Sequence, residues 1–248
     1  MNCKNCNEIV RGNYCNNCGQ RTNIERITIS SFMYEVVHSV FQIDKGFLYT
    51  CTQLLIKPGL TIKDFLKGKR KSHFKPIGYV LTLSTLYFLL AQLLGENTWM
   101  NDVVLGFTES AQGNKNNRIE VPVLFTWLSK NFAYTTILLL PVFSFASYIA
   151  FKNFAVNYIE HLVLNAYITG QQAVFYSFFI ILKKLIKIEI LELIPVVLAV
   201  LYTFWVFWGF FNEGNRLVNI LRTIIVYILY LIFCLGLLFL FWSIQGGK

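Results

Sequence analysis

The chain has 248 residues, of which 55% are hydrophobic and 14% are charged. Soluble domains contain about 45–50% apolar and about 25% charged residues, so this composition argues against a soluble protein and indicates a membrane protein. The net charge is +9, and more than half of the 22 basic residues precede residue 76. Basic residues gathered ahead of the first long apolar run are typical of cytosolic segments of membrane proteins, and they argue against nucleic acid as the partner.

Four cysteines lie close together at the start of the chain. They form two Cys-x-x-Cys pairs, which are Cys3 with Cys6 and Cys15 with Cys18. Two such pairs offer the closed set of four thiolates that structural Zn²⁺ prefers, whereas redox pairs normally occur in a βαβ context that is absent here. A segment this short does not fold by apolar burial alone. We therefore predict that residues 1–22 form a zinc ribbon that holds a structural Zn²⁺.

The residues around the cysteine pairs support this prediction. Asn7 and Gly19 each follow a pair, and both residue types accept the left-handed backbone conformation that such a turn requires. The only aromatic residue of the ribbon is Tyr14, which is too little for nucleic-acid recognition. No apolar leader precedes the ribbon, so we expect it in the reducing cytosol, in contact with a protein partner.

The segment 23–75 is mixed in polarity, and we predict that it lies at the membrane interface. Residues 28–43 place apolar side chains on one helical face and polar side chains on the other, as an interfacial helix does. Further along, Thr61 followed by Asp64 is typical of a capping box at a helix start, and Gly68 can end that helix.

A run of basic residues stands directly before the first apolar run. It includes Lys69, Arg70, Lys71 and Lys75. Two interpretations stay open. The run can serve simply as a positive-inside signal, or it can bind the headgroups of anionic lipids, where each cation contributes about 1 kcal/mol.

Five apolar runs are long enough to cross a bilayer, since about 20 helical residues span a hydrocarbon core of about 30 Å. They cover residues 76–95, 132–151, 161–182, 190–211 and 222–242. We therefore predict an all-α polytopic membrane protein, with about five transmembrane helices in residues 76–248. The distribution of Lys and Arg favours a cytosolic N-terminus and a C-terminus outside.

One group of lysines disagrees with this orientation. Lys183, Lys184 and Lys187 follow the third run and would lie on the outer face. Either the third run is a re-entrant or tilted element, or these side chains extend to the outer interface.

The third run carries a stripe of polar residues on one helical face. The stripe comprises His161, Asn165, Thr169, Gln172 and Tyr176, with Glu160 directly before it. Polar side chains rarely face lipid, so we expect this face to point into the helix bundle. The stripe either joins helices through hydrogen bonds, or it lines a polar path or small-molecule pocket with Glu160 and His161 at its mouth.

Several short motifs stand out along the chain. They are the cysteine pairs with Tyr14, Gly19 and Gln20, then Asp44-Lys45-Gly46-Phe47, Pro58-Gly59, Gly68-Lys69-Arg70 ahead of Pro76, and Glu160-His161. Together they resemble an uncharacterised bacterial membrane family of unknown function. The resemblance implies a four-cysteine zinc ribbon, a multi-helix membrane region and a place in the bacterial inner (cytoplasmic) membrane. A further histidine expected from that family in the third run is missing here, and the family brings no known activity.

The apolar runs lack both a pair of buried acids and an HExxH helix, which are features of intramembrane proton relays and proteases. We therefore expect a non-enzymatic adaptor or assembly component, in which the ribbon recruits a protein partner or a second copy and the helices contact the bilayer. The alternative is a transporter, channel or lipid-handling protein that uses the polar stripe of the third run. An enzyme acting on a lipid-borne substrate is the third hypothesis.

Overall fold

The computed structural model describes residues 1–24, 26–31, 46–102, 105–106, 127–128, 131–186 and 189–246. Within these parts of the chain the regular structure is helical, apart from two isolated β-bridges in the N-terminal ribbon. The elements are α2 (Gly46–Ile56), α3 (Pro58–Leu66), α4 (Pro76–Leu94), α7 (Phe132–Ala150), α8 (Tyr158–Ile186), the 3-10 helix η1 (Glu189–Glu192), α9 (Leu193–Phe210) and α10 (Arg216–Gly246).

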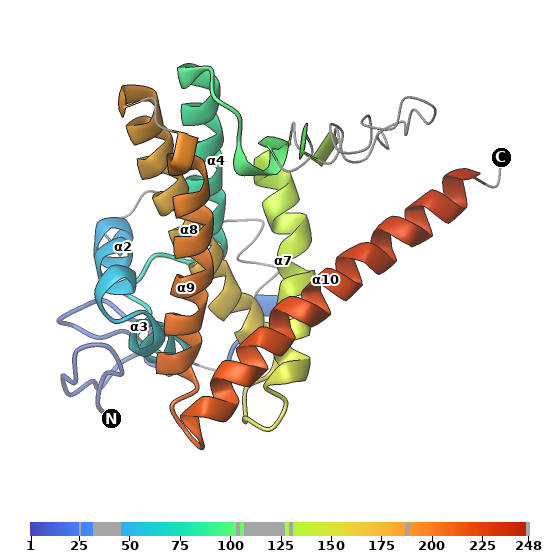
Figure 1. The fold of residues 1–248 in the computed structure, drawn as a ribbon. Coiled ribbons are helices and arrows are strands. Elements are labelled where there is room, and N and C mark those ends of the chain that lie inside the picture. Colours follow the sequence, from blue (N-terminus) through green and yellow to red (C-terminus); the bar gives the residue numbers. More distant parts are fainter. Residues whose placement is uncertain are drawn as a thin grey trace, which may run out of the picture.

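The five long helices run in alternating directions (Figure 1). α4 starts at the end of the molecule where the N-terminus, α2 and α3 lie. α7 returns toward that end, and α8, α9 and α10 continue the alternation. α10 leans away from the other helices, and its last turn lies at the opposite end of the molecule from the N-terminus.

Each predicted apolar run falls on one of these five helices. Three of the helices are long and apolar enough to cross a membrane, namely Pro76–Leu94, Leu193–Phe210 and Arg216–Leu238. They indicate a membrane protein. α7 contributes a shorter apolar stretch, Tyr134–Ala150, and α8 carries the polar stripe. The number of five membrane crossings therefore stays a prediction.

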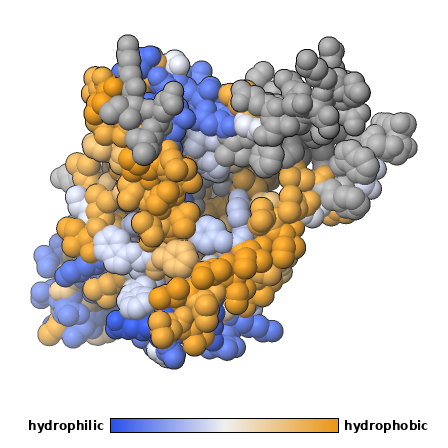
Figure 2. Space-filling view, in the orientation of Figure 1, coloured by the Kyte–Doolittle hydropathy of each residue, from blue (hydrophilic) through white to orange (hydrophobic). Residues whose placement is uncertain are grey.

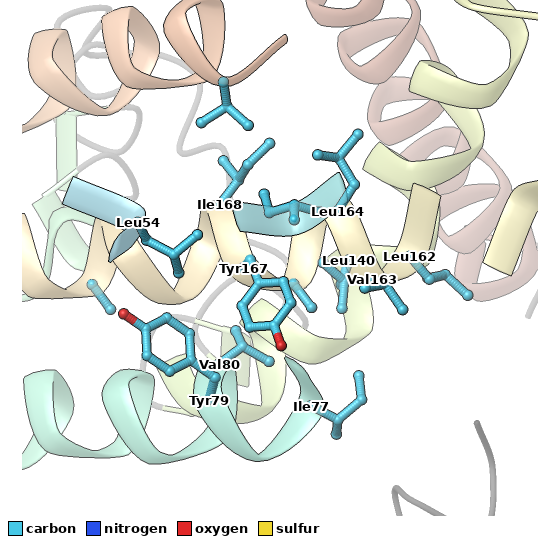
Figure 3. Packing of buried hydrophobic residues seen from close by; sticks show 14 of the residues in the cluster. Leu54, Ile77, Tyr79, Val80, Leu140, Leu162, Val163, Leu164, Tyr167 and Ile168 are labelled. Carbon is cyan, nitrogen blue, oxygen red and sulfur yellow. The ribbon is translucent and has the colours of Figure 1, made fainter. Parts of the chain in front are cut away.

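α8 occupies the centre of the bundle and packs against α4, α7 and α9. Its crossing with α4 is close because Gly170 has no side chain, and a Cβ there would lie 2.5 Å from the ring of Tyr79. Tyr79 also faces Tyr167 of α8, with 5.8 Å between ring centroids (Figure 3). The Tyr79 hydroxyl contacts Oε1 of Gln171 at 2.5 Å. A helix with protein on several sides can satisfy polar side chains internally, so α8 tolerates more polar residues than its neighbours.

α3 is fixed against one end of the bundle, and α2 packs against its side (Figure 1). α3 crosses α9 where Gly59 meets Gly209, and a Cβ on Gly59 would collide with the α9 backbone. Beside this crossing, the hydroxyl of Tyr202 on α9 donates to the backbone carbonyl of Leu54 on α2 at 3.0 Å. The two helices that precede α4 in the chain are therefore held in place by the bundle.

The predicted capping box at Thr61 is wrong. α3 already begins at Pro58, and the Thr61 hydroxyl donates to the backbone carbonyl four residues earlier at 2.7 Å. Proline suits a first helical position because it needs no hydrogen-bond acceptor there. The helix end is as predicted, since Gly68 follows α3 with a φ of 109°. Most of the predicted interfacial helix 28–43 lies outside the described residues.

Apolar residues cover the middle of the molecule, and polar residues lie toward its two ends (Figure 2). The apolar part of α10 is only 11% buried. So much exposed apolar surface is favourable in contact with lipid, whereas in water it would promote aggregation.

Candidate metal centre and membrane cavity

The four predicted cysteine ligands converge on one point. Their Sγ atoms all lie within 4.8 Å of one another, with 3.6 Å between Cys3 and Cys18 and 3.5 Å between Cys6 and Cys15. Sulfur atoms at about 2.3 Å from a tetrahedral Zn²⁺ stand about 3.8 Å apart, whereas the sulfurs of a disulfide are bonded at about 2.0 Å. The four thiols are free and could hold a metal ion.

The ribbon is built from the same turn used twice. The N–H of Asn7 donates to the carbonyl of Cys3 at 2.9 Å, and the N–H of Gly19 donates to the carbonyl of Cys15 at 2.8 Å. Asn7 and Gly19 have φ values of 63° and 71°, so both adopt the left-handed conformation predicted from their residue types. Each turn presents two thiols to the other turn.

Cys3 is prepared for metal binding by its own turn. The backbone N–H groups of Cys6 and Asn5 hydrogen-bond its sulfur and lower the pKa of Cys3 to about 7. The thiolate is the form that binds metal. The buried hydrophobic residues of this small cluster are Cys3, Val10 and Cys15. The apolar core of the ribbon is therefore minimal, and a bound metal would supply most of its stability.

Gln20 fixes the ribbon to the turn that follows α3. Its Nε2 donates to the carbonyl of Gly68 at 3.0 Å, and its Oε1 accepts from the backbone N–H groups of Arg70 and Lys71, each at 3.0 Å. The side chain is almost completely buried. Three hydrogen bonds from one amide hold the ribbon in place against the basic run.

The basic residues predicted to bind headgroups are Lys69, Arg70, Lys71 and Lys75. Their side chains have different surroundings. Lys69 pairs with Asp64 at 2.9 Å, and the guanidinium of Arg70 lies 5.7 Å from the ring centroid of Phe65. Lys71 and Lys75 are exposed. The backbone of the run at Arg70 and Lys71 thus binds the ribbon through Gln20, while the side chains of Lys71 and Lys75 are exposed cations.

Glu160 lies at the start of α8, where it makes two kinds of contact. Its carboxylate accepts from the N–H of Asn157 at 2.9 Å, and the N–H of Glu160 donates to the side chain of Asn157 at 2.8 Å. This reciprocal pair is a capping box. Both carboxylate oxygens also accept from the guanidinium of Arg26, each at 2.6 Å.

The half of the polar stripe nearer the start of α8 is buried against α7. The Oγ of Ser147 lies 2.9 Å from His161 Nδ1 and accepts from Asn165 Nδ2 at 2.9 Å. The same hydroxyl donates to the carbonyl of Ser144 at 3.0 Å. Since it has a single proton, the arrangement is consistent when His161 donates from Nδ1. Both His161 and Asn165 are fully buried, so this half forms a closed contact between two helices.

The other half of the stripe, farther along α8, lines a cavity of about 210 Å³ in the bundle. Thr169, Gln172 and Tyr176 all contribute to its wall. The Nε2 of Gln172 donates to the carbonyl of Ala199 and to the hydroxyl of Thr203, each at 3.0 Å. One helical face thus serves two purposes, as a hydrogen-bonded contact with α7 and as a cavity wall.

The lysines at the end of α8 pair with acids. Lys183 lies 2.9 Å from Glu96 and 2.6 Å from Glu192, and Lys184 lies 3.7 Å from Glu96. The hydrogen bond from Lys183 lowers the pKa of Glu96. α8 is continuous over 29 residues, which is about 43 Å at 1.5 Å per residue. Lys187 lies outside the described residues.

The contacts of several residues were not predicted from the sequence. Gln20 and Arg26 offer no local signal, because their partners lie far along the chain. Ser144 and Ser147 stand three residues apart in an apolar run, and this spacing on one helical face was an available signal. The capping box that begins at Asn157 was also visible in the sequence.

Comparison with known proteins adds little about activity. The family model described as "Protein of unknown function (DUF3667)" matches residues 44–88, a minor part of the chain that includes α2, α3 and the first part of α4. No curated protein matches the chain, and no solved structure does. The chain is thus similar to a family of unknown function over the segment that leads into its first long helix.

Proposed function

We propose that the chain is a five-helix integral membrane protein of the bacterial inner membrane, with its N-terminal ribbon on the cytosolic side. The alternating directions of the long helices support five crossings (Figure 1). α8 would cross as the central helix, where its neighbours accept its polar side chains. The basic residues near the ribbon support a cytosolic N-terminus and a C-terminus outside.

The metal of the ribbon is proposed to be Zn²⁺ in a structural role. Four sulfur ligands suit Zn²⁺, and they leave no open position for a water or substrate. The exposed Lys71 and Lys75 next to the ribbon are proposed to contact anionic lipids at the same surface.

The ribbon is proposed to act as the docking face of a non-enzymatic adaptor or assembly component. One observation carries this proposal. Gln20 holds one side of the ribbon against the bundle, while Ile9 and Tyr14 remain 71% and 56% exposed. Apolar side chains on a rigid surface bind a partner at a low entropic cost, since the surface is already ordered.

Photocrosslinking in growing cells tests the adaptor role. A photoreactive phenylalanine analogue in place of Tyr14 should crosslink to one defined protein or to a second copy of this chain. Ile9→Glu should reduce that crosslink about tenfold or more, because a charge buried in an apolar contact is costly. Asn16→Glu places the same charge on an exposed polar position of the ribbon and should leave the crosslink intact.

The metal content of the variants is a further control. Both variants should retain the ribbon metal, so that loss of folding is distinguished from loss of contact. Crosslinks to many proteins in similar amounts, or a crosslink that is equally strong in Ile9→Glu, would contradict the adaptor role.

The second candidate is a transporter, channel or lipid-handling protein that uses the stripe of α8. The cavity beside Thr169 and Gln172 favours it. A channel or transporter with a continuous polar path along the stripe is the least supported version of this candidate. His161 and Asn165 are fully buried in the contact with α7 and would interrupt such a path. A pocket for an apolar ligand fits this geometry better.

A further inference from the structure

The cavity along the farther half of the α8 stripe has the properties of a lipid site. We propose that it binds one acyl chain of a membrane lipid, with a hydrogen-bond acceptor of that lipid, such as an ester carbonyl, facing Ser84 and Trp99. This inference uses the proposed membrane placement and is independent of the adaptor role.

The wall of the cavity is uncharged and mostly apolar. It contains none of the charged side chains that the structure describes, and its aliphatic part includes Leu139, Leu140, Val196 and Val200. Ions and strongly hydrated solutes lose their hydration in such a site without compensation. Flexible methylene chains are not strongly hydrated, so they enter such a site without that cost, and they fill irregular apolar spaces.

Two residues of the wall each carry a buried polar side-chain atom that lacks a partner among the described residues. The Oγ of Ser84 and the Nε1 of Trp99 are buried, and no described residue hydrogen-bonds them. Other buried serines of this bundle, such as Ser144 and Ser177, donate to the carbonyl four residues earlier. Ser84 makes no such bond. Buried donors without a partner are costly and point to an acceptor supplied by a bound molecule.

Access to the cavity is through the bilayer. α9 and α10 form part of its wall, through Val196 and Val200 on one side and Tyr227 and Tyr230 on the other. Neighbouring side chains on both helices, among them Leu201 at 57% and Leu231 at 60% exposure, face outward. The outer surfaces of α9 and α10 beside the cavity are largely apolar (Figure 2). A lipid tail can enter there without crossing water.

Photolabelling in vesicles tests the site. The full chain is reconstituted in vesicles of phosphatidylethanolamine and phosphatidylglycerol that contain a phospholipid with a diazirine on one acyl chain, and the labelled residues are mapped by mass spectrometry. We expect labels on cavity residues of α8 and α9, in addition to a background on outward-facing residues. A second arm with a free diazirine fatty acid distinguishes an intact phospholipid from a free acid as the source of the chain.

Matched variants give the test its specificity. Thr169→Phe fills the cavity from α8 and should reduce cavity labelling about tenfold, whereas Leu201→Phe adds the same ring to the lipid-facing side of α9 and should leave the labelling unchanged. Val200→Phe fills the cavity from the opposite wall, in case Thr169→Phe does not fold. Ser84→Ala should weaken cavity labelling about fivefold by removing one hydrogen bond.

The opposite results would overturn the proposal. They are labels confined to outward-facing residues in the wild type, or cavity labels that persist in both filled variants. Failure of the membrane placement is separate from these outcomes, because the chain would then not float with the vesicles. Failure of the adaptor role is separate too, since crosslinking from the ribbon does not depend on the cavity.

Discussion

Arg26 and Glu160 are 134 residues apart in the chain and form a two-pronged ion pair, with Nε and Nη2 each 2.6 Å from a carboxylate oxygen. Arg26 follows the ribbon directly, and Glu160 lies in the first turn of the central helix α8. The pair therefore links the metal-binding end of the chain to the start of the most enclosed helix. Together with Gln20, it places the ribbon on the bundle at two separate points.

The two contacts of Glu160 can be separated by substitution. Glu160→Gln keeps a side chain that can complete the capping box but removes the ion pair, so it should cost less than about 1 kcal/mol, because the Arg26 side chain is 58% exposed. Glu160→Ala removes both contacts and should cost about 1–2 kcal/mol. Thermal unfolding in detergent micelles measures both. Arg26→Gln serves as the control, and combining it with Glu160→Gln should add almost nothing further.

Loss of the Gln20 side chain should release the ribbon without unfolding it. Gln20→Ala removes three hydrogen bonds to the turn at Gly68–Lys71 and leaves the four thiols in place. Hydrogen exchange of the Lys71 N–H should become about tenfold faster or more, since Gln20 Oε1 is its acceptor. The Arg70 N–H also donates to the carbonyl of Gly68 at 3.0 Å, so its exchange should change less. Asn17→Ala, at an exposed position of the same ribbon, should exchange like the wild type. Unchanged exchange in Gln20→Ala would show that other contacts hold the ribbon.

The purified chain should contain one Zn²⁺. Cys15→Ser removes one of the four ligands and should lower the zinc content to a small fraction of that value, because three thiolates hold the ion less tightly at neutral pH. Cys234→Ser removes a cysteine of α10, outside the cluster, and should retain the full content. Elemental analysis of the two variants and the wild type measures the zinc content of each. Another metal in the wild type, or equal zinc in Cys15→Ser, would refute the structural zinc site.

The loop between α7 and α8 reports on the number of crossings. With Cys51 and Cys234 replaced by serine, Lys152→Cys should not react with a membrane-impermeant maleimide in intact cells, because five crossings put this exposed position inside. Asn97→Cys, an exposed position after α4, should react. Permeabilised cells should show labelling of both. If Lys152→Cys reacts in intact cells as Asn97→Cys does, α7 and α8 do not each cross the membrane.

Acid should loosen the segment around His73. Burial lowers the pKa of His73 below its ordinary value of 6.5, and the ring lies edge-on to Tyr49 at 5.4 Å. As the pH falls through 6.5, the unfolded state takes up a proton that the folded state does not, so stability decreases until the pH passes the lower, folded pKa. Thermal unfolding between pH 8 and pH 5 should show this loss.

The matched variant for this measurement is His73→Phe. Asp64 and Lys69 are the charged groups that act on His73 in the folded chain, and both remain in the variant, as does the ribbon. Its stability should therefore depend less on pH than that of the wild type across the same range. An identical pH dependence would assign the acid sensitivity to other groups.

The sequence by itself determined the features that depend on neighbouring residues. The spacing of the cysteines predicted a four-thiol cluster, and the residue types at Asn7 and Gly19 predicted left-handed turns that the structure contains. The apolar runs located all five long helices, and Gly68 marked the end of α3. Each of these follows from local chain geometry or from residue preference, which a single stretch of sequence contains. The capping box at Thr61 failed because Pro58 offered a stronger start three residues earlier.

Only the tertiary structure decided which distant groups meet. It brought Gln20 to the turn after α3 and Arg26 to Glu160, and it divided one polar stripe into a closed contact with Ser147 and a cavity wall at Thr169. Helical periodicity shows that stripe residues share a face, but the neighbours of a face depend on how the other helices cross it. Those crossings are set by packing, as where Gly59 meets Gly209, and packing depends on the whole bundle at once.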